Sequence, residues 1–148
     1  MLRQPIRSRA RRSGFTLVEM LVVVLILELL MAVALPLYLS AEADAQLKTC
    51  RANMQTIANA AQAWYTSNGA QSPYSTLKTL TAGNLHTVLT DLPSDPICPA
   101  ANKATYTIVT DGYVKDATGN PFFIPTGAFG VTCSTAGHGG FIPGVMGN

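Results

Sequence analysis

The 148-residue sequence predicts an α+β fold, in which a long N-terminal helix precedes a small antiparallel β-sheet domain. Residues 20–39 are almost entirely apolar, and a helix that crosses a bilayer needs about 20 such residues. Apolar side chains then recur every three or four residues up to Trp64, as expected for an amphipathic helix. Short runs of β-branched and aromatic residues follow between turn-forming residues, and such runs are typical of strands.

The first half of the predicted helix is expected to span a membrane. Five arginines precede the apolar run, and positive charge on that side favours its retention in the cytoplasm. The remainder of the chain would then be exported. Glu28 and Pro36 interrupt the run, and Pro36 should kink or loosen the helix because proline removes a backbone hydrogen bond. The five arginines are Arg3, Arg7, Arg9, Arg11 and Arg12.

The second half of the helix is expected to be amphipathic. No further helix-breaking residue occurs before Asn68-Gly69, which is a suitable C-terminal stop. The sequence therefore predicts one continuous helix over residues 15–67, with about residues 15–39 in the membrane and residues 40–67 against the domain. The apolar stripe of the second half consists of Leu47, Cys50, Met54, Ile57, Ala61 and Trp64.

Residues 68–148 are expected to form the β-rich domain. A strand is predicted over residues 105–110, and Asp111-Gly112 predicts a hairpin turn to a second strand over residues 113–115. The glycine-rich tail from Ser134 is expected to be irregular. Further elements are expected as strands over residues 122–124 and 128–133, and as helical turns over residues 77–80, capped by Ser75, and residues 85–89.

Three cysteines in an exported chain suggest one disulfide and one remaining thiol. We predict a disulfide between Cys98 and Cys133, which both lie in the β-rich part. Closing that loop would contribute about 4 kcal/mol in the chain-entropy model. Cys50, on the long helix, is expected to be free and packed. The sequence leaves the other two pairings open.

No metal site, cofactor or enzymatic activity is predicted. His86 and His138 do not reach zinc-finger spacing with the three cysteines. Asp111, Asp116 and Asn120 offer oxygen ligands of the kind calcium prefers, but turn chemistry explains these residues equally well. The sequence contains no phosphate-binding glycine loop and no pairing of a nucleophile with a base that matches a known motif.

The net charge depends on whether the leader is removed. The full chain has ten basic and eight acidic side chains, but five of the basic ones are the leader arginines. A chain without the leader would therefore have a side-chain charge of −3. A protein of that sign offers no broad nucleic-acid footprint, so nucleic acid is not expected as a direct partner.

The segment Gly14-Phe15-Thr16-Leu17-Val18-Glu19 lies between the arginines and the apolar run. An acidic side chain inside a membrane helix is costly and favours a nearby cation. Cleavage after Gly14 would supply one, because Phe15 would then present an α-amine four residues from Glu19. That amine could belong to the same chain or to a neighbouring chain.

This combination of a basic leader, Gly14, Phe15, Glu19 and an apolar run resembles the class III signal of type IV prepilins and pseudopilins. The resemblance implies a basic leader over residues 1–14 and cleavage after Gly14 by a prepilin peptidase. It further implies N-methylation of Phe15 and a role for Glu19 in neutralising a neighbour's terminus during assembly. Glu28 departs from the family pattern, which usually has a small or apolar residue there.

The resemblance also implies a function and a location. The chain would be a structural subunit of a type IV pilus or of a type II secretion-like filament; a competence filament is a third possible use. Its partners would be the prepilin peptidase, other pilin subunits, an inner-membrane assembly platform and the lipid bilayer. It would sit in the bacterial inner membrane as a single-pass protein, with its N-terminus cytoplasmic before processing, and then in a periplasmic or cell-surface filament.

An ordinary signal peptide is the alternative interpretation. Ala41-Glu42-Ala43 and Ala43-Asp44-Ala45 both fit an A-x-A cleavage site. The chain would then be a secreted or membrane-anchored binding module. The apolar run is longer than the 7–15 residues typical of a signal peptide, and Glu19 is an unusual residue at its start.

Overall fold

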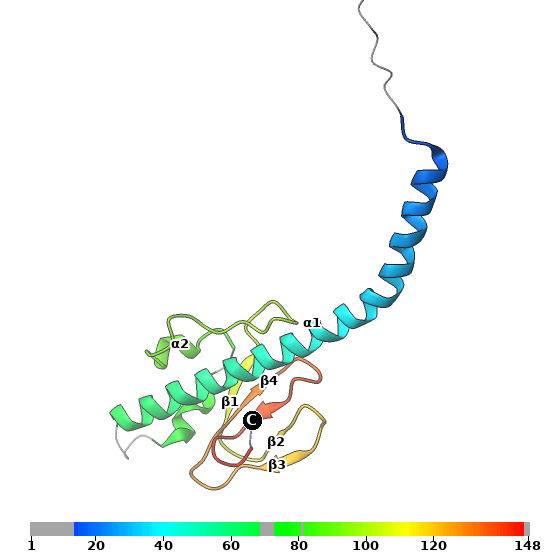
Figure 1. The fold of residues 1–148 in the computed structure, drawn as a ribbon. Coiled ribbons are helices and arrows are strands. Elements are labelled where there is room, and N and C mark those ends of the chain that lie inside the picture. Colours follow the sequence, from blue (N-terminus) through cyan, green and yellow to red (C-terminus); the bar gives the residue numbers. More distant parts are fainter. Residues whose placement is uncertain (1–13, 69–72, 81, 147–148) are drawn as a thin grey trace, which may run out of the picture. The chain divides into compact units, whose positions relative to one another are not determined.

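The computed structural model describes residues 14–68, 73–80 and 82–146 (Figure 1). The leader arginines and Gly69 therefore lie outside the described residues. The chain divides into two compact units, Met1–Ser40 and Ala41–Asn148, which are described separately below. The elements in chain order are α1 (Leu17–Asn68), η1 (Tyr74–Thr79), α2 (Leu85–Val88), β1 (Tyr106–Val109), β2 (Tyr113–Lys115), β3 (Pro121–Phe123), β4 (Gly130–Cys133) and β5 (Gly140–Phe141).

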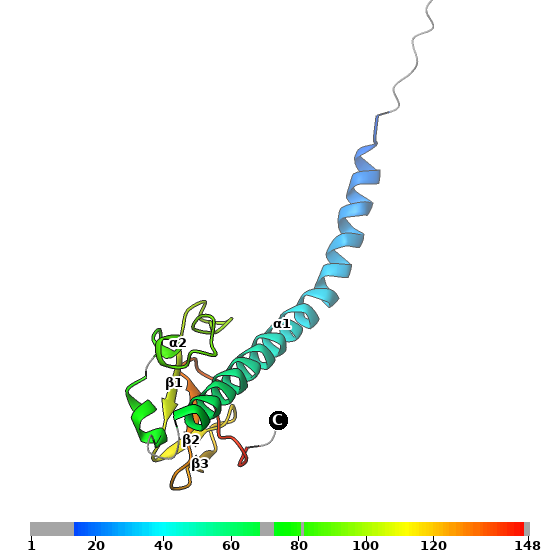
Figure 2. The same ribbon diagram turned by 90° about the vertical axis from the view of Figure 1, so that its left-hand side faces the viewer.

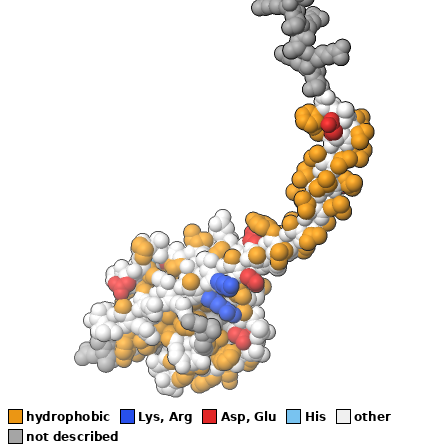
Figure 3. Space-filling model, in the orientation of Figure 1, with side chains coloured by type: hydrophobic (Ala, Val, Ile, Leu, Met, Phe, Trp, Pro, Cys, Tyr) orange, Lys and Arg blue, Asp and Glu red, His pale blue; other side chains and the backbone are white. Residues whose placement is uncertain are grey.

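In the first unit, helix α1 has apolar side chains on all its faces. The helix begins at Leu17 and continues without interruption through Pro36. It is long and apolar enough to cross a membrane, and within the described part of the chain none of the side chains in its most apolar stretch is buried. Figure 3 shows hydrophobic side chains covering the visible face of this segment. The predicted long apolar helix is confirmed.

In the second unit, the remaining part of α1 contributes one stripe of side chains to the core. The predicted stripe is correct, since its central members are buried and Trp64 packs partly buried against them. The sheet residues Tyr106, Ile108 and Val131 contact the same core, which confirms the packing of the helix against a small antiparallel sheet. Figure 2 shows the strands beside this part of α1. The buried residues of the helix are Cys50, Met54, Ile57, Ala58, Ala60 and Ala61.

The strands form two small antiparallel sheets. One sheet has the order β1-β4-β5, with Tyr106 opposite Cys133 and Thr132 opposite Gly140. The other sheet consists of β2 and β3 alone. A second, smaller core lies beside it and is made by Val114, Ile124 and Ile142.

The hairpin predicted at Asp111-Gly112 is wrong, although the chain does turn there. Gly112 adopts φ +80°, but β1 pairs with β4 and β2 pairs with β3. A second local turn lies between β2 and β3. The Asp116 carboxylate accepts backbone N–H bonds from Thr118 and Asn120, both at 2.9 Å, and thereby closes the loop between those two strands. Side chain to backbone bonds of this kind stabilise a turn locally.

Two smaller expectations also need correction. The helical turn near Leu77 exists as η1, but Pro73 rather than Ser75 occupies its N-cap position. The tail after Ser134 is not wholly irregular, because Gly140 and Phe141 pair with β4 as strand β5. Glycine at position 140 allows this pairing, since a Cβ there would collide with the Val114 side chain and the Val131 carbonyl. The helical turn predicted over residues 85–89 is confirmed by α2.

Candidate functional site

The segment predicted to be processed lies at the start of α1. Gly14, Phe15 and Thr16 precede the helix, and the Phe15 side chain is 79% exposed. Glu19 lies in the first helical turn, where a negative charge interacts favourably with the helix dipole. The chain thus presents its predicted cleavage position on an exposed, non-helical segment directly before a rigid helix.

Thr16 and Glu19 form a reciprocal capping box. The Glu19 carboxylate accepts the Thr16 backbone N–H at 2.9 Å and the Thr16 hydroxyl at 2.8 Å. In return, the Glu19 backbone N–H donates to the Thr16 hydroxyl oxygen at 3.2 Å. This arrangement satisfies backbone groups that a helix start otherwise leaves without partners. Sequence reasoning missed Thr16, although the spacing T-x-x-E before an apolar run is a known signal.

The capping box also fixes where the Glu19 carboxylate lies. Because it accepts the Thr16 N–H, it folds back toward the N-terminal end of the helix, one residue from Phe15. An α-amine at Phe15 would therefore form close to this carboxylate. The same geometry leaves the carboxylate on an exposed helix end, where an amine from another chain has access.

Glu28 lies apart from Glu19. Nine residues correspond to two and a half helical turns, which places the two acids on opposite faces of α1. Glu28 lies along the helix beside the apolar side chains of Met20, Leu21, Val24 and Leu25. The two carboxylates therefore cannot share one cation on one face.

The predicted disulfide residues lie in a second candidate site, in the domain. Cys50 comes from α1, Cys98 from the turn before β1, and Cys133 from the end of β4. These three buried thiols and the Nδ1 or Nε2 atom of His138 all lie within 4.8 Å of one another. The structure therefore brings together one histidine and all three cysteines, whereas the sequence suggested only the pair Cys98 and Cys133.

The environment of each thiol shifts its acidity differently. Burial raises the pKa of Cys50 to about 12. Burial also raises the pKa of Cys98, but bonds from the Thr135 hydroxyl and from the backbone of Ala101 and Ala100 outweigh it, so its pKa falls to about 6. The thiolate is the form of a cysteine that acts as a nucleophile or a metal ligand.

The disulfide remains a prediction. Cys98 and Cys133 are neighbours, and all three cysteines are free thiols in the structure. Both residues contact a hydroxyl at 3.2 Å: Cys98 that of Thr135 and Cys133 that of Thr105.

The residues considered above as calcium ligands, and His86, form hydrogen bonds or ion pairs with other side chains. Asp116 and Asn120 bond to each other within the β2–β3 turn, whereas Asp111 forms an ion pair with Lys78. His86 lies 2.7 Å from the Asp95 carboxylate and takes no part in the thiol cluster.

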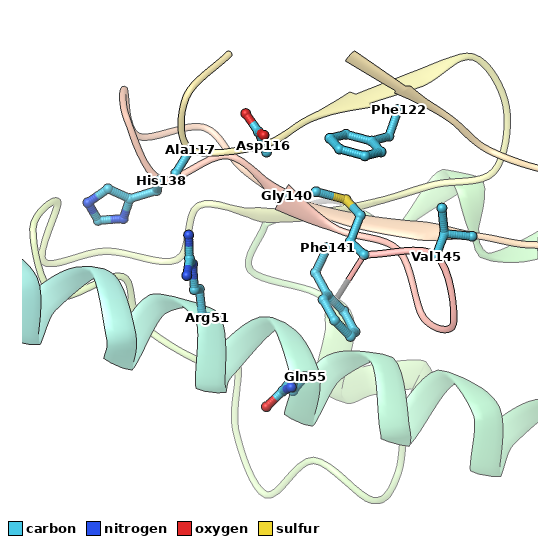
Figure 4. A pocket seen from close by; sticks show the side chains of 10 residues that line it. Arg51, Gln55, Asp116, Ala117, Phe122, His138, Gly140, Phe141 and Val145 are labelled. Atoms are coloured by element: carbon cyan, nitrogen blue, oxygen red, sulfur yellow. The ribbon is translucent and has the colours of Figure 1, made fainter. Parts of the chain in front are cut away.

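A pocket of about 300 Å³ opens beside His138, the histidine of the cluster (Figure 4). His138 and Arg51 line it on one side, and Asp116 and Phe122 on the other. His138 is only partly buried, so the pocket gives solvent access to the outer edge of the cluster.

Comparison with known proteins identifies the N-terminal site. The family model described as the prokaryotic N-terminal methylation motif matches residues 9–35. Comparisons with curated proteins and with solved structures gave no match. The matched segment contains the exposed Gly14-Phe15 bond, the capping box and most of the apolar helix. Residues 9–35 of this chain are a type IV prepilin-type signal.

Proposed function

We propose that this chain is the precursor of a pilin-like subunit that assembles into a type IV pilus or a type II secretion-like filament. A prepilin peptidase removes residues 1–14, and the new N-terminal Phe15 is methylated. The processed chain is anchored in the inner membrane by the first half of α1. It then joins other pilin subunits on an assembly platform in that membrane.

One observation supports this proposal above the others. The methylation motif coincides with the start of a helix whose most apolar stretch is not buried by any of the residues that the structure describes. Such a surface needs lipid or another protein to cover it. A prepilin signal followed by a helix of this kind fits both a membrane-anchored stage and an assembled stage.

The chemistry of assembly follows from the position of Glu19. Cleavage creates an α-amine at Phe15, close to a carboxylate already directed toward that end of the helix. Burying an unpaired carboxylate among apolar helices costs free energy. Pairing the carboxylate with an amine lowers that cost. In a bundle of such helices, van der Waals packing and the pairing of charges would replace contacts with lipid.

The alternative of an ordinary signal peptide is less well supported. Its candidate cleavage sites, between Ala41 and Ala45, lie inside α1. Proteolytic sites concentrate in exposed loops and chain termini rather than in regular helices. The Gly14-Phe15 bond, in contrast, precedes the helix.

Mass spectrometry of the protein isolated from its host membranes tests the proposal directly. We expect an N-terminal peptide that begins at Phe15 and has one additional methyl group. A terminus at Glu42 or beyond would contradict the proposal, as would a protein that retains its arginines while assembled.

A pair of variants separates the charge of Glu19 from its capping role. Glu19→Gln retains an acceptor for Thr16 but removes the charge, so we expect normal processing and loss of filaments. Thr16→Ala removes the capping hydroxyl but retains the charge, so we expect filaments to persist. Electron microscopy of sheared filaments and immunoblots of the processed form measure the two outcomes. Filaments from Glu19→Gln would exclude the charge-pairing role.

A further inference from the structure

We propose that Cys50, Cys98, Cys133 and His138 bind one zinc ion in the domain. This site is separate from the N-terminal signal and does not depend on the proposed function. Its ligands come from three separate parts of the fold, namely α1, the turn before β1 and the β4–β5 hairpin.

The distances between the ligand atoms suit tetrahedral zinc. With Zn–S bonds near 2.3 Å and Zn–N bonds near 2.0–2.1 Å, neighbouring ligand atoms in a tetrahedron are about 3.5–3.8 Å apart. His138 Nδ1 lies 3.5 Å from the Cys98 sulfur and 3.9 Å from the Cys133 sulfur. All four ligand atoms lie within 4.8 Å of one another, so the widest pair needs to approach by about 1 Å. Three cysteines and one histidine form a common ligand set for structural zinc.

The backbone holds each ligand in place before any ion binds. The Cys98 N–H donates to the Lys103 carbonyl at 3.0 Å and the Cys98 carbonyl accepts the Asn102 N–H at 2.8 Å, which closes a tight turn around Cys98. The Cys133 N–H donates to the Gly139 carbonyl at 3.0 Å, and this bond fixes the hairpin loop that contains His138. Cys50 is held in place because it lies on the face of α1 that packs into the core.

Gly139 is required for the approach of the histidine loop to the neighbouring turn. Its φ is +67°, and a Cβ at this position would collide with the backbone of Asp116 and Ala117. The loop therefore packs against the β2–β3 turn with backbone on backbone.

Two of the three sulfurs have a hydroxyl beside them. The Thr135 hydroxyl lies 3.2 Å from the Cys98 sulfur, and the Thr105 hydroxyl lies 3.2 Å from the Cys133 sulfur. Cys50 shares the buried core with Tyr106, whose hydroxyl accepts a bond from Asn53 at 3.1 Å. Hydrogen bonds of this kind stabilise and orient the thiolates that coordinate a metal.

A disulfide between Cys98 and Cys133 competes with zinc, because it consumes two of the four ligands. It would leave the close approach of Cys50 and His138 to the two bonded sulfurs unexplained. The complete arrangement is therefore better explained by an ion than by a bond between two of its members.

Zinc binding can be accounted for in protons and charge, and solvent can reach one of the ligands. Zn²⁺ displaces the thiol protons of the three cysteines and binds neutral His138, which leaves a site of net charge −1. Of the four ligands, His138 lines the pocket, and the basic side chain of Arg51 lines it as well (Figure 4). Because protons are released, the affinity should rise with pH.

Metal analysis of the mature full-length chain, purified in detergent without added reductant or chelator, gives the first test. We expect about one zinc per chain and three thiols that react only after a chelator is added. After removal of zinc, titration with Co²⁺ should produce thiolate-to-cobalt charge-transfer bands and the intense visible bands of a tetrahedral site. Added zinc should abolish this spectrum.

Variants then identify the ligands. Cys50→Ser and His138→Gln should each weaken zinc binding by more than about 10-fold. Mutation of residues that only hydrogen-bond to metal ligands already lowers metal affinity by about 10–100-fold, so loss of a ligand itself should cost at least as much. His86→Gln is the matched control, since this histidine bonds to Asp95 and lies outside the cluster. Its affinity for zinc should be unchanged.

Two results would overturn the proposal. One is a chain whose mass is lower by two hydrogen atoms, with a Cys98–Cys133 disulfide and no zinc. The other is a reduced chain that shows no tetrahedral Co²⁺ spectrum. The Co²⁺ experiment uses the unmodified protein, so the proposal stays testable even if Cys50→Ser does not fold.

Discussion

The two halves of α1 use apolar side chains for different purposes. In the first half, Ile26 is 51% exposed, and its neighbours are exposed in the same way. In the second half, Ile57 is fully buried and contacts the core of the domain. Both residues are isoleucines in one continuous helix. The partner of the first half must come from outside the chain, whereas the partner of the second half is the chain itself.

This difference teaches how one helix can serve two environments. An apolar surface on every face suits lipid or a bundle of like helices, but a single apolar stripe suits one covering layer. The charged and amide side chains that follow Ser40 restrict the apolar surface to that stripe. The contrast can be tested by placing similar changes in both halves.

The largest expected effect comes from truncating the matched isoleucines. Ile57→Ala should lower the free energy of unfolding of the domain by about 2–5 kcal/mol, because it leaves a cavity in a closed core. Ile26→Ala should change it by less than about 0.5 kcal/mol. Urea unfolding in detergent, followed by the fluorescence of Trp64, the single tryptophan, measures both. Equal effects would show that the halves are not independent.

An added charge should have the opposite pattern, with a large effect in the first half of α1 and a small one in the second half. Leu30→Lys places an ammonium near the middle of the apolar run and should cost about 2.5–3.5 kcal/mol of membrane insertion. Gln62→Lys, on the exposed side of the second half, should leave both insertion and stability almost unchanged. A membrane-insertion assay with reporter sites on either side of the segment measures the difference. Normal insertion of Leu30→Lys would argue against a spanning helix.

A pair of glycines tests how closely the domain packs. Gly139 and Gly144 both have positive φ, so alanine at either should cost about 1–2 kcal/mol from backbone strain. Only at Gly139 would the new methyl group also collide with backbone, which should add about 1–3 kcal/mol. Thermal unfolding of the two variants gives the comparison. Similar losses would mean that the loop around His138 is not held tightly.

The smallest expected effect concerns Asp116. Bonds from the Thr118 hydroxyl, and then from Asn120 and the backbone, lower the pKa of this carboxyl in the folded chain. Its contribution to stability is therefore present above the unfolded pKa of about 3.9 and is lost as the pH falls through the lower, folded pKa. Asp116→Asn should flatten the acid side of a plot of the urea midpoint against pH. An unchanged acid limb would show that the turn does not contribute.

The sequence predicted the long helix, its buried stripe and the prepilin-type signal because each depends on neighbours in the chain. The period of the stripe follows from helix geometry, and the signal is a contiguous set of residues. The strands were located well for the same reason, since β-branched content is local. Their pairing was predicted less well, because Asp111-Gly112 and the Asp116 turn are both local signals, and only the packing of the domain determined which one closes a hairpin.

The thiol cluster marks the limit of what could be predicted. The positions of Cys50, Cys98, Cys133 and His138 follow no metal-binding spacing, so no local pattern relates them. They meet because α1 packs on a sheet whose β4–β5 hairpin places Cys133 and His138 over the helix face that contains Cys50. By itself, the sequence determined what depends on distance along the chain, namely the long apolar helix and its prepilin-type signal. Only the tertiary structure decided which distant side chains share one small volume, because that depends on packing between elements.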